Sequence, residues 1–190
     1  MGGVAKALIT LDGQPLIRRT LDALRAAGVR DTVVVTGAHH ARIAPVVPPG
    51  AARVVYNPEH ARGQQTSVRL GLESVDPQVD ALLMVLCDQP LIGAGDLGEL
   101  LAAFASRPAG EMLVPEVDGQ RGNPVVVSGA ALRRILGLDR GIACREFMRL
   151  HPELVWRYRT SNGHFVLDLD SVADLGALAR QTGLAVGLPG

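Results

Sequence analysis

The 190-residue sequence has little that would direct it to a nucleic acid, a membrane or an oxidising compartment. Its formal net charge is zero, so it lacks the basic excess of a nucleic-acid or membrane-surface binder. No apolar run reaches the ~18–20 residues that span a bilayer, and no charged-then-apolar leader opens the chain. Two cysteines, Cys87 and Cys144, are too few for a disulfide framework. These absences predict a cytoplasmic globular protein that binds neither nucleic acid nor membrane.

Lysine is almost absent. Lys6 is the only lysine among the 19 basic residues. A lysine ammonium meets a phosphate as a compact point charge, whereas arginine offers a planar fork. The single lysine near the start of the chain therefore favours a phosphate contact, with chance as the alternative. The neighbouring glycines do not make a Walker A loop.

Alternating strand and helix patterns predict an α/β fold. Turn residues at Asp118-Gly119 also predict a β-hairpin. The order of elements indicates one doubly wound domain over residues 1–190, with a mostly parallel sheet and a small hairpin insertion. Hydrophobic spacing predicts helices at 15–28, 63–75, 96–104, 128–136, 142–150 and from 171 onward, and strands at 32–36, 53–56, 82–87, 111–115, 124–127, 154–158 and 165–170.

The apolar run at residues 82–87 ends abruptly in polar residues. Its lack of polar alternation suits a strand buried on both faces of a parallel sheet. Asp88, Gln89 and Pro90 follow it, and ligands of open α/β sheets bind beyond the carboxyl ends of such strands. Asp88 therefore suits Mg²⁺, which prefers oxygen ligands, unless it only begins a turn.

Three further segments carry candidate ligand contacts. The polar sequence 63–67 opens a helix with free backbone N–H groups, unless it is a plain cap. Asn123 precedes a proline and its amide could bind a ligand or serve a turn. Asp168 and Asp170 alternate on an expected strand and could join Asp88 around one Mg²⁺, although Asp170 could instead cap the next helix.

His39 and His40 lie on an expected helix start. Without a third ligand, such a pair is more often part of the solvated surface than a metal site.

These motifs occur in one order along nearly the whole chain. They are Lys6-Ala7-Leu8, residues 11–16, Asn57-Pro58, residues 63–67, Asp88-Gln89-Pro90-Leu91, residues 121–125 and Asp168-Leu169-Asp170. The set closely resembles the molybdenum-cofactor nucleotidyltransferase family, which attaches CMP or GMP to molybdopterin. The Asp88-Gln89-Pro90 triplet is similar to the cytidylyltransferase branch.

The resemblance implies a Rossmann-like nucleotidyltransferase fold, Mg²⁺ as cofactor and CTP or GTP as substrate. The terminal phosphate of the pterin would attack the α-phosphorus and expel pyrophosphate, a reaction that needs positioning and charge neutralisation. Lys6 and Asp88 would be catalytic, and Asp88, Asp168 and Asp170 would hold the metal. Nucleotide contacts would come from Gly2, Gly3, Lys6, Gly63, Gln64, Thr66, Ser67 and Asp88, and acceptor contacts from Gln89, Pro90, Arg121, Gly122 and Asn123.

The beginning of the chain departs from the family pattern. Family members open with a buried strand and a Leu-Ala-Ala-Gly-x-x-x-Arg-Met-Gly loop, and this sequence begins at its Met-Gly, so we expect upstream residues to be missing. Ala5 replaces the usual proline. Two alternatives stay open, namely a non-catalytic molybdopterin- or nucleotide-binding chaperone for a molybdenum hydroxylase apo-enzyme, and an NADPH-dependent reductase. No Gly-x-Gly-x-x-Gly fingerprint supports the reductase.

Overall fold

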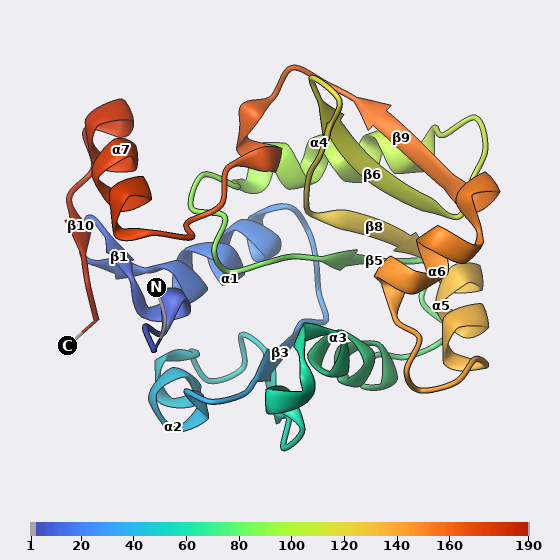
Figure 1. The fold of residues 1–190 in the computed structure, drawn as a ribbon, viewed down its shortest axis with the longest axis horizontal. Coiled ribbons are helices and arrows are strands. Elements are labelled where there is room, and N and C mark those ends of the chain that lie inside the picture. Colours follow the sequence, from blue (N-terminus) through green and yellow to red (C-terminus); the bar gives the residue numbers. More distant parts are fainter. Residues whose placement is uncertain (1–2, 190) are drawn as a thin grey trace.

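The computed structural model describes residues 3–189, in which helices and strands alternate along most of the chain (Figure 1). The described α-helices are α1 (Leu16–Ala26), α2 (His40–Ile43), α3 (Gln64–Glu73), α4 (Ala94–Ala105), α5 (Gly129–Leu136), α6 (Cys144–Leu150) and α7 (Val172–Thr182). The described strands are β1 (Thr10–Leu11), β2 (Gln14–Pro15), β3 (Val33–Thr36), β4 (Arg53–Tyr56), β5 (Ala81–Met84), β6 (Met112–Val117), β7 (Gln120–Arg121), β8 (Val125–Ser128), β9 (Val155–Arg159) and β10 (Val186–Gly187).

The largest sheet is mixed, which corrects the expectation of a mostly parallel one. β8 lies between β5 and β6 and runs antiparallel to both, whereas β9 pairs with β6 in parallel. The cause is the predicted hairpin, whose turn residues Asp118 and Gly119 both have positive φ. This turn reverses the chain between β6 and β7, and the returning chain then enters the sheet as β8.

β5 is shorter and less buried than predicted. It ends at Met84, and all four of its residues are half-buried. In the part of the chain that the structure describes, β5 is an edge strand whose hydrogen-bonded neighbour is β8, while β3 pairs with β4 in a separate parallel ladder. β1 pairs with β2 and β10 in a third small sheet.

The core lies on both faces of β6 and β8. Val125 and Val127 face a cluster with α5 and α6, whereas Val126 between them faces a cluster with α4. This alternation is the period-two pattern of a strand that is covered on both sides. Between residues 3 and 189 no helix combines the length and apolar character needed to cross a bilayer.

The predicted strand at 165–170 is wrong. Residues Gly163–Val166 form a 3-10 helix instead, and residues 167–170 are irregular. The Asn162 side chain accepts a hydrogen bond from the backbone N–H of His164, which favours a turn over an extended chain. The predicted helix from residue 171 onward is confirmed as α7, which begins with a capping box of Ser171 and Asp174, and Val172 in its first turn is 64% exposed.

Candidate active site

Lys6 lies between two carboxylates, at the end of β5 where the sequence predicts a ligand site. Its Nζ atom is 3.1 Å from Asp88 Oδ2 and 2.8 Å from Asp170 Oδ1. The Lys6 and Asp88 side chains are about one-quarter exposed, at 28% and 26%, whereas Asp170 is 78% exposed. Asp168 interacts electrostatically with all three residues. We call Lys6, Asp88, Asp168 and Asp170 the lysine centre.

Electrostatics shift two pKa values in the lysine centre. Burial by itself would lower the pKa of Lys6, but hydrogen bonds and attraction to Asp170 and Asp88 raise it overall. Desolvation and the negative charges of Asp88 and Asp170 raise the pKa of Asp168, against opposing effects of Lys6 and of a hydrogen bond from Gln89. The ammonium is therefore held charged, while one carboxyl group of the centre takes up a proton more readily than usual.

Backbone hydrogen bonds hold the two acidic segments together. The N–H of Leu169, which is fully buried, donates to the Asp88 carbonyl at 2.9 Å. The N–H groups of Asp170 and Ser171 both donate to the Asp174 carboxylate, at 2.8 and 2.7 Å. The N-cap of α7 is Ser171 rather than Asp170, whose backbone N–H joins the cap while its side chain contacts Lys6, and its role as a metal ligand stays a prediction.

The Phe165 carbonyl joins two of the other predicted motifs. It accepts hydrogen bonds from Gln89 Nε2 at 3.0 Å and from the Asn123 N–H at 2.9 Å. A Cβ on Gly122 would collide with the same carbonyl, so this close approach requires glycine. Gln89 is 3% exposed and Pro90 is also buried. Their side chains therefore support the site from inside rather than lie on its surface.

The Gly63–Ser67 segment is organised by a buried asparagine. Asn57 is 3% exposed and its Nδ2 donates to the hydroxyls of Thr66 and Ser67, both at 2.9 Å. Gly63 has φ of 118°, which glycine accommodates, whereas Gln64 is exposed at the start of α3. Among the described residues no hydrogen bond joins this segment to the lysine centre. The sequence motif Asn57-Pro58 signalled this residue, but not its bonding role.

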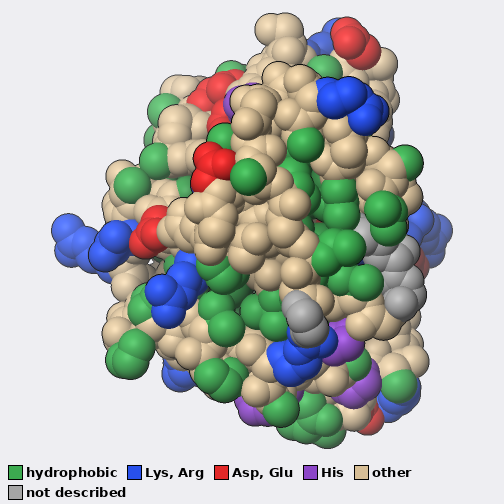
Figure 2. Space-filling model, turned by 90° about the vertical axis from the view of Figure 1, so that its left-hand side faces the viewer, with side chains coloured by type: hydrophobic (Ala, Val, Ile, Leu, Met, Phe, Trp, Pro, Cys, Tyr) green, Lys and Arg blue, Asp and Glu red, His purple; other side chains and the backbone are tan. Residues whose placement is uncertain are grey.

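Within the described residues, Gly3 and the histidines add no further metal-ligand group. Gly2 lies outside the described residues, and Gly3 has φ of +83° with open space around its Cβ position. His40 contacts Tyr56 with ring centroids 5.0 Å apart, and Tyr56 in turn contacts His60. Figure 2 shows histidine side chains gathered at the lower edge of this face.

The predicted metal ligands lie together but do not form a ready metal cage. In residues 3–189 no group of three or more His, Cys, Asp or Glu residues is arranged to hold a metal ion. The cation that Asp88 and Asp170 face is the ammonium of Lys6. Their oxygens nevertheless accommodate a positive charge, and oxygen is the donor that Mg²⁺ prefers.

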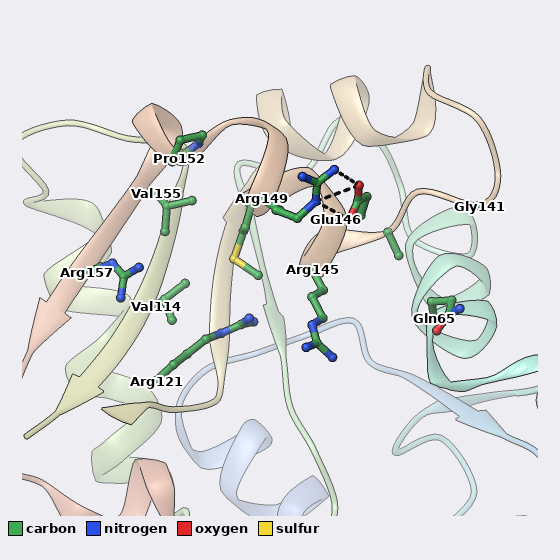
Figure 3. Close-up of a pocket in the computed structure, with 12 residues that line it drawn as sticks. Gln65, Val114, Arg121, Gly141, Arg145, Glu146, Arg149, Pro152, Val155 and Arg157 are labelled. Atoms are coloured by element: carbon green, nitrogen blue, oxygen red, sulfur yellow. Dashed lines mark hydrogen bonds and ion pairs between the residues drawn. The ribbon is translucent and has the colours of Figure 1, made fainter. Parts of the chain in front are cut away.

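A cavity of about 610 Å³ lies between the helices α3 and α6 and the strands β6, β7 and β9. Arg121, whose role as an acceptor contact stays a prediction, lines it from β7, and Arg145, Arg149 and Arg157 line it as well (Figure 3). These three arginines were not among the residues predicted from the sequence. The available signal was the four-residue spacing of Arg145 and Arg149, which places both on one face of the predicted helix.

The sequence pattern of the family described as MobA-like NTP transferase domain matches residues 1–155, and the chain belongs to this family. The matched region contains Lys6, Asp88 and the 121–123 motif, and it ends before Asp168 and Asp170. The bifunctional protein GlmU of Rubrobacter xylanophilus is 36% identical over 132 residues, which are 69% of this chain and 28% of GlmU. The chain thus corresponds to about a quarter of that relative's length.

Solved structures share the fold. Rv0371c from Mycobacterium tuberculosis H37Rv has a TM-score of 0.74 at 20% identity, covering 94% of this chain and 90% of that chain. Its manganese complex has a TM-score of 0.70 at 21% identity, covering 94% and 93%. A nucleotidyl transferase from Methanothermobacter has a TM-score of 0.72 at 21% identity, covering 93% and 84%. These likenesses confirm the predicted α/β, Rossmann-like nucleotidyltransferase fold.

Proposed function

We propose that the chain transfers CMP from CTP to molybdopterin or a related phosphorylated small molecule and releases pyrophosphate. The single observation that carries this proposal is the convergence of Lys6, Asp88, Asp168 and Asp170 at the end of β5, in a member of the MobA-like NTP transferase family. The preference for CTP over GTP rests on the resemblance of Asp88-Gln89-Pro90 to the cytidylyltransferase branch.

The charges of the lysine centre suit a nucleoside triphosphate bound with a cation. Mg²⁺ would be held by Asp88 and Asp170, with Asp168 beside them, and when bound it would neutralise developing charge on the phosphates. The ammonium of Lys6 would leave its two carboxylates and turn to the triphosphate. Manganese in the Rv0371c complex supports a divalent cation in proteins of this fold.

The proposed reaction is a single in-line displacement. A phosphate oxygen of the acceptor forms a bond to the α-phosphorus of CTP, the bond to the bridging oxygen of the β-phosphate breaks, and pyrophosphate leaves with that electron pair. No side-chain nucleophile is needed, so the work of the chain is positioning. Gly2, Gly3, Lys6, Gly63, Gln64, Thr66, Ser67 and Asp88 would contact the nucleotide, and Arg121, Gly122 and Asn123 the acceptor.

The support for these contacts differs among the residues. Thr66 and Ser67 are held by Asn57, so we assign the nucleoside contact in this segment chiefly to the backbone N–H groups at the start of α3. Gln89 and Pro90 would act by holding the acidic loop in place. A cytoplasmic location, a single working domain over residues 1–190 and a molybdenum hydroxylase as recipient of the product stay predictions.

A transfer assay tests the proposal. The chain is incubated with molybdopterin, Mg²⁺ and CTP or GTP, and mass spectrometry detects the adduct while a coupled assay counts pyrophosphate. We expect a CMP adduct with one pyrophosphate for each adduct formed. Binding of CTP and molybdopterin without any adduct would indicate the chaperone instead, and oxidation of NADPH during turnover would indicate the reductase.

A further inference from the structure

The end of β9 and the segment after it are attached to helix α4 (Figure 1). Two carboxylates of this helix, Asp96 and Glu99, are three residues apart and therefore lie on one face of it. Four alternate side chains contact these carboxylates, namely Tyr158, Thr160, Asn162 and His164. We call these six residues the α4 clamp.

Asp96 joins the start of α4 to the segment 162–164. Its Oδ1 accepts a hydrogen bond from Asn162 Nδ2 at 2.7 Å, and its Oδ2 accepts one from the Gly93 N–H at 2.7 Å. His164 Nδ1 lies 3.2 Å from both oxygens, and it carries the hydrogen in this contact because a carboxylate only accepts. The Asp96 side chain is only 13% exposed, and hydrogen bonds to an ionised group are stronger than those between neutral groups.

The segment that Asp96 holds leads directly to the Phe165 carbonyl. Asn162 Oδ1 accepts from the His164 N–H at 3.1 Å, and the Asn162 carbonyl accepts from the Phe165 N–H at 3.4 Å. Phe165 is fully buried, and its own carbonyl accepts from the Asn123 N–H at 2.9 Å. A continuous set of contacts therefore runs from Asp96 through Asn162 and Phe165 to Asn123.

We propose that Asp96 is a positioning residue, which fixes Asn123 through Asn162 and the Phe165 carbonyl. That Asn123 in turn contacts the acceptor rests on the proposed function, but the positioning of Asn123 does not. The lysine centre is held by a separate hydrogen bond, from the Leu169 N–H to the Asp88 carbonyl. Loss of the α4 clamp therefore loosens Asn123 and leaves the nucleotide side of the site in place.

Amide hydrogen exchange of the 190-residue chain, followed by NMR, tests the proposal without any substrate. Asp96→Asn keeps one oxygen for the Gly93 N–H, but it places an NH2 group opposite the NH2 group of Asn162. We expect the Asn123 amide to exchange about tenfold faster or more, the scale of one hydrogen bond to a charged group. The Leu169 amide should stay within about twofold of its wild-type rate, because its hydrogen bond is separate.

A second variant and a matched control keep the test selective. Asn162→Ala removes the link to Asp96 but leaves the α4 cap intact, so it should accelerate exchange at Asn123 in the same way. The control is Asp76→Asn, an exposed residue whose replacement keeps the oxygen that accepts from the Gln78 N–H, and exchange at Asn123 should not change. Unchanged exchange at Asn123 in both clamp variants, or equal acceleration at Asn123 and Leu169, would overturn the proposal.

The transfer assay then tests what the positioning does. Asp96→Asn should raise the KM of the phosphorylated acceptor about tenfold or more and leave the KM of CTP within about twofold. An equal rise of both KM values would contradict a role confined to the acceptor side. If the wild-type chain transfers no CMP while the exchange result holds, the proposed function fails and the positioning of Asn123 by Asp96 stands.

Discussion

The lysine centre and the 610 Å³ cavity lined by Arg121, Arg145, Arg149 and Arg157 are both charged, but they differ in how their charges are compensated. In the lysine centre, the ammonium of Lys6 contacts the carboxylates of Asp88 and Asp170 directly. In the cavity, Arg121 and Arg145 face each other without a carboxylate between them. The single cation of the lysine centre is therefore compensated within the chain by carboxylates, whereas Arg121 and Arg145 form no ion pair across residues 3–189 and remain exposed to solvent.

This difference in charge compensation affects how each region could bind a ligand. If a triphosphate binds Lys6 as proposed, the carboxylates need another cation in exchange, so we expect nucleotide binding to depend on a divalent cation. An anion can enter the cavity without such an exchange, because no internal pair has to break. We therefore expect cation dependence for nucleotide binding but not for binding of the phosphorylated acceptor at Arg121.

The largest effect is expected from Asp88→Asn, which removes one charge of the lysine centre and keeps the shape of the side chain. The rate of pyrophosphate release should fall by about a thousandfold or more, which is ~4 kcal/mol of barrier. Asp22→Asn, at an exposed carboxylate on α1, is the matched control and should leave the rate unchanged. Full activity of Asp88→Asn would remove Asp88 from the mechanism.

A smaller effect is expected from Lys6→Ala. The variant loses the point charge for the triphosphate, so the Kd of Mg²⁺–CTP in equilibrium titration should rise about 10- to 100-fold, or roughly 1.4–2.8 kcal/mol. The Kd of the phosphorylated acceptor, whose proposed contact is Arg121, should stay the same. An equal loss of affinity for both ligands would contradict the separation of the two regions.

Gly122→Ala tests how the two regions are connected. Its added Cβ collides with the Phe165 carbonyl, which also bonds Gln89 and Asn123. Overpacking of this kind costs typically 1–3 kcal/mol, so we expect Tm in calorimetry to fall by roughly 2–10 °C. Gly95→Ala on α4 has open space at its Cβ position and should leave Tm unchanged or slightly higher. An unchanged Tm for Gly122→Ala would refute this close approach.

The smallest effect concerns the pH dependence of stability at Asp168. Its folded-state pKa lies above the ordinary 3.8, so the folded state binds this proton more tightly than the unfolded state. The resulting stabilisation is present below pH 3.8 and is lost as pH rises through the folded-state pKa. Asp168→Asn should therefore gain Tm relative to the wild type as pH rises from about 3 toward neutrality. A relative loss of Tm over that range would reverse the sign of the pKa shift.

Much of the fold could be predicted because its signals are local. The β-branched run at β8, the turn at Asp118-Gly119 and the Ser171–Asp174 cap each specify their own structure within a few residues. The position of β8 between β5 and β6 was not predictable in this way, since chain order does not give spatial order. Residues 165–170 alternate between apolar and polar side chains as a strand does. The hydrogen bond of the His164 N–H to Asn162 and that of the Leu169 N–H to Asp88 nevertheless hold this segment in a non-extended conformation.

The two charged regions were predictable to different degrees. Each residue of the lysine centre can be recognised on its own in the sequence, because Lys6 is the only lysine and the acidic residues follow apolar runs. The cavity joins arginines from β7, β9 and α6, and these are common residues in a sequence with 18 arginines. Within residues 3–189, Arg121 and Arg145 differ from the other two in forming no ion pair, which only the packing of the chain reveals.

The most direct test of the central claim is a thermal-shift series with CTP, GTP and NADPH, each with and without Mg²⁺. A ligand at ~100 times its Kd adds about 2.7 kcal/mol of stability, which should raise Tm by roughly 5–10 °C. The exchange of partners at Lys6 predicts a shift with CTP that requires Mg²⁺ and is absent in Asp88→Asn. An equal shift without Mg²⁺, or no shift with any nucleotide, would contradict it.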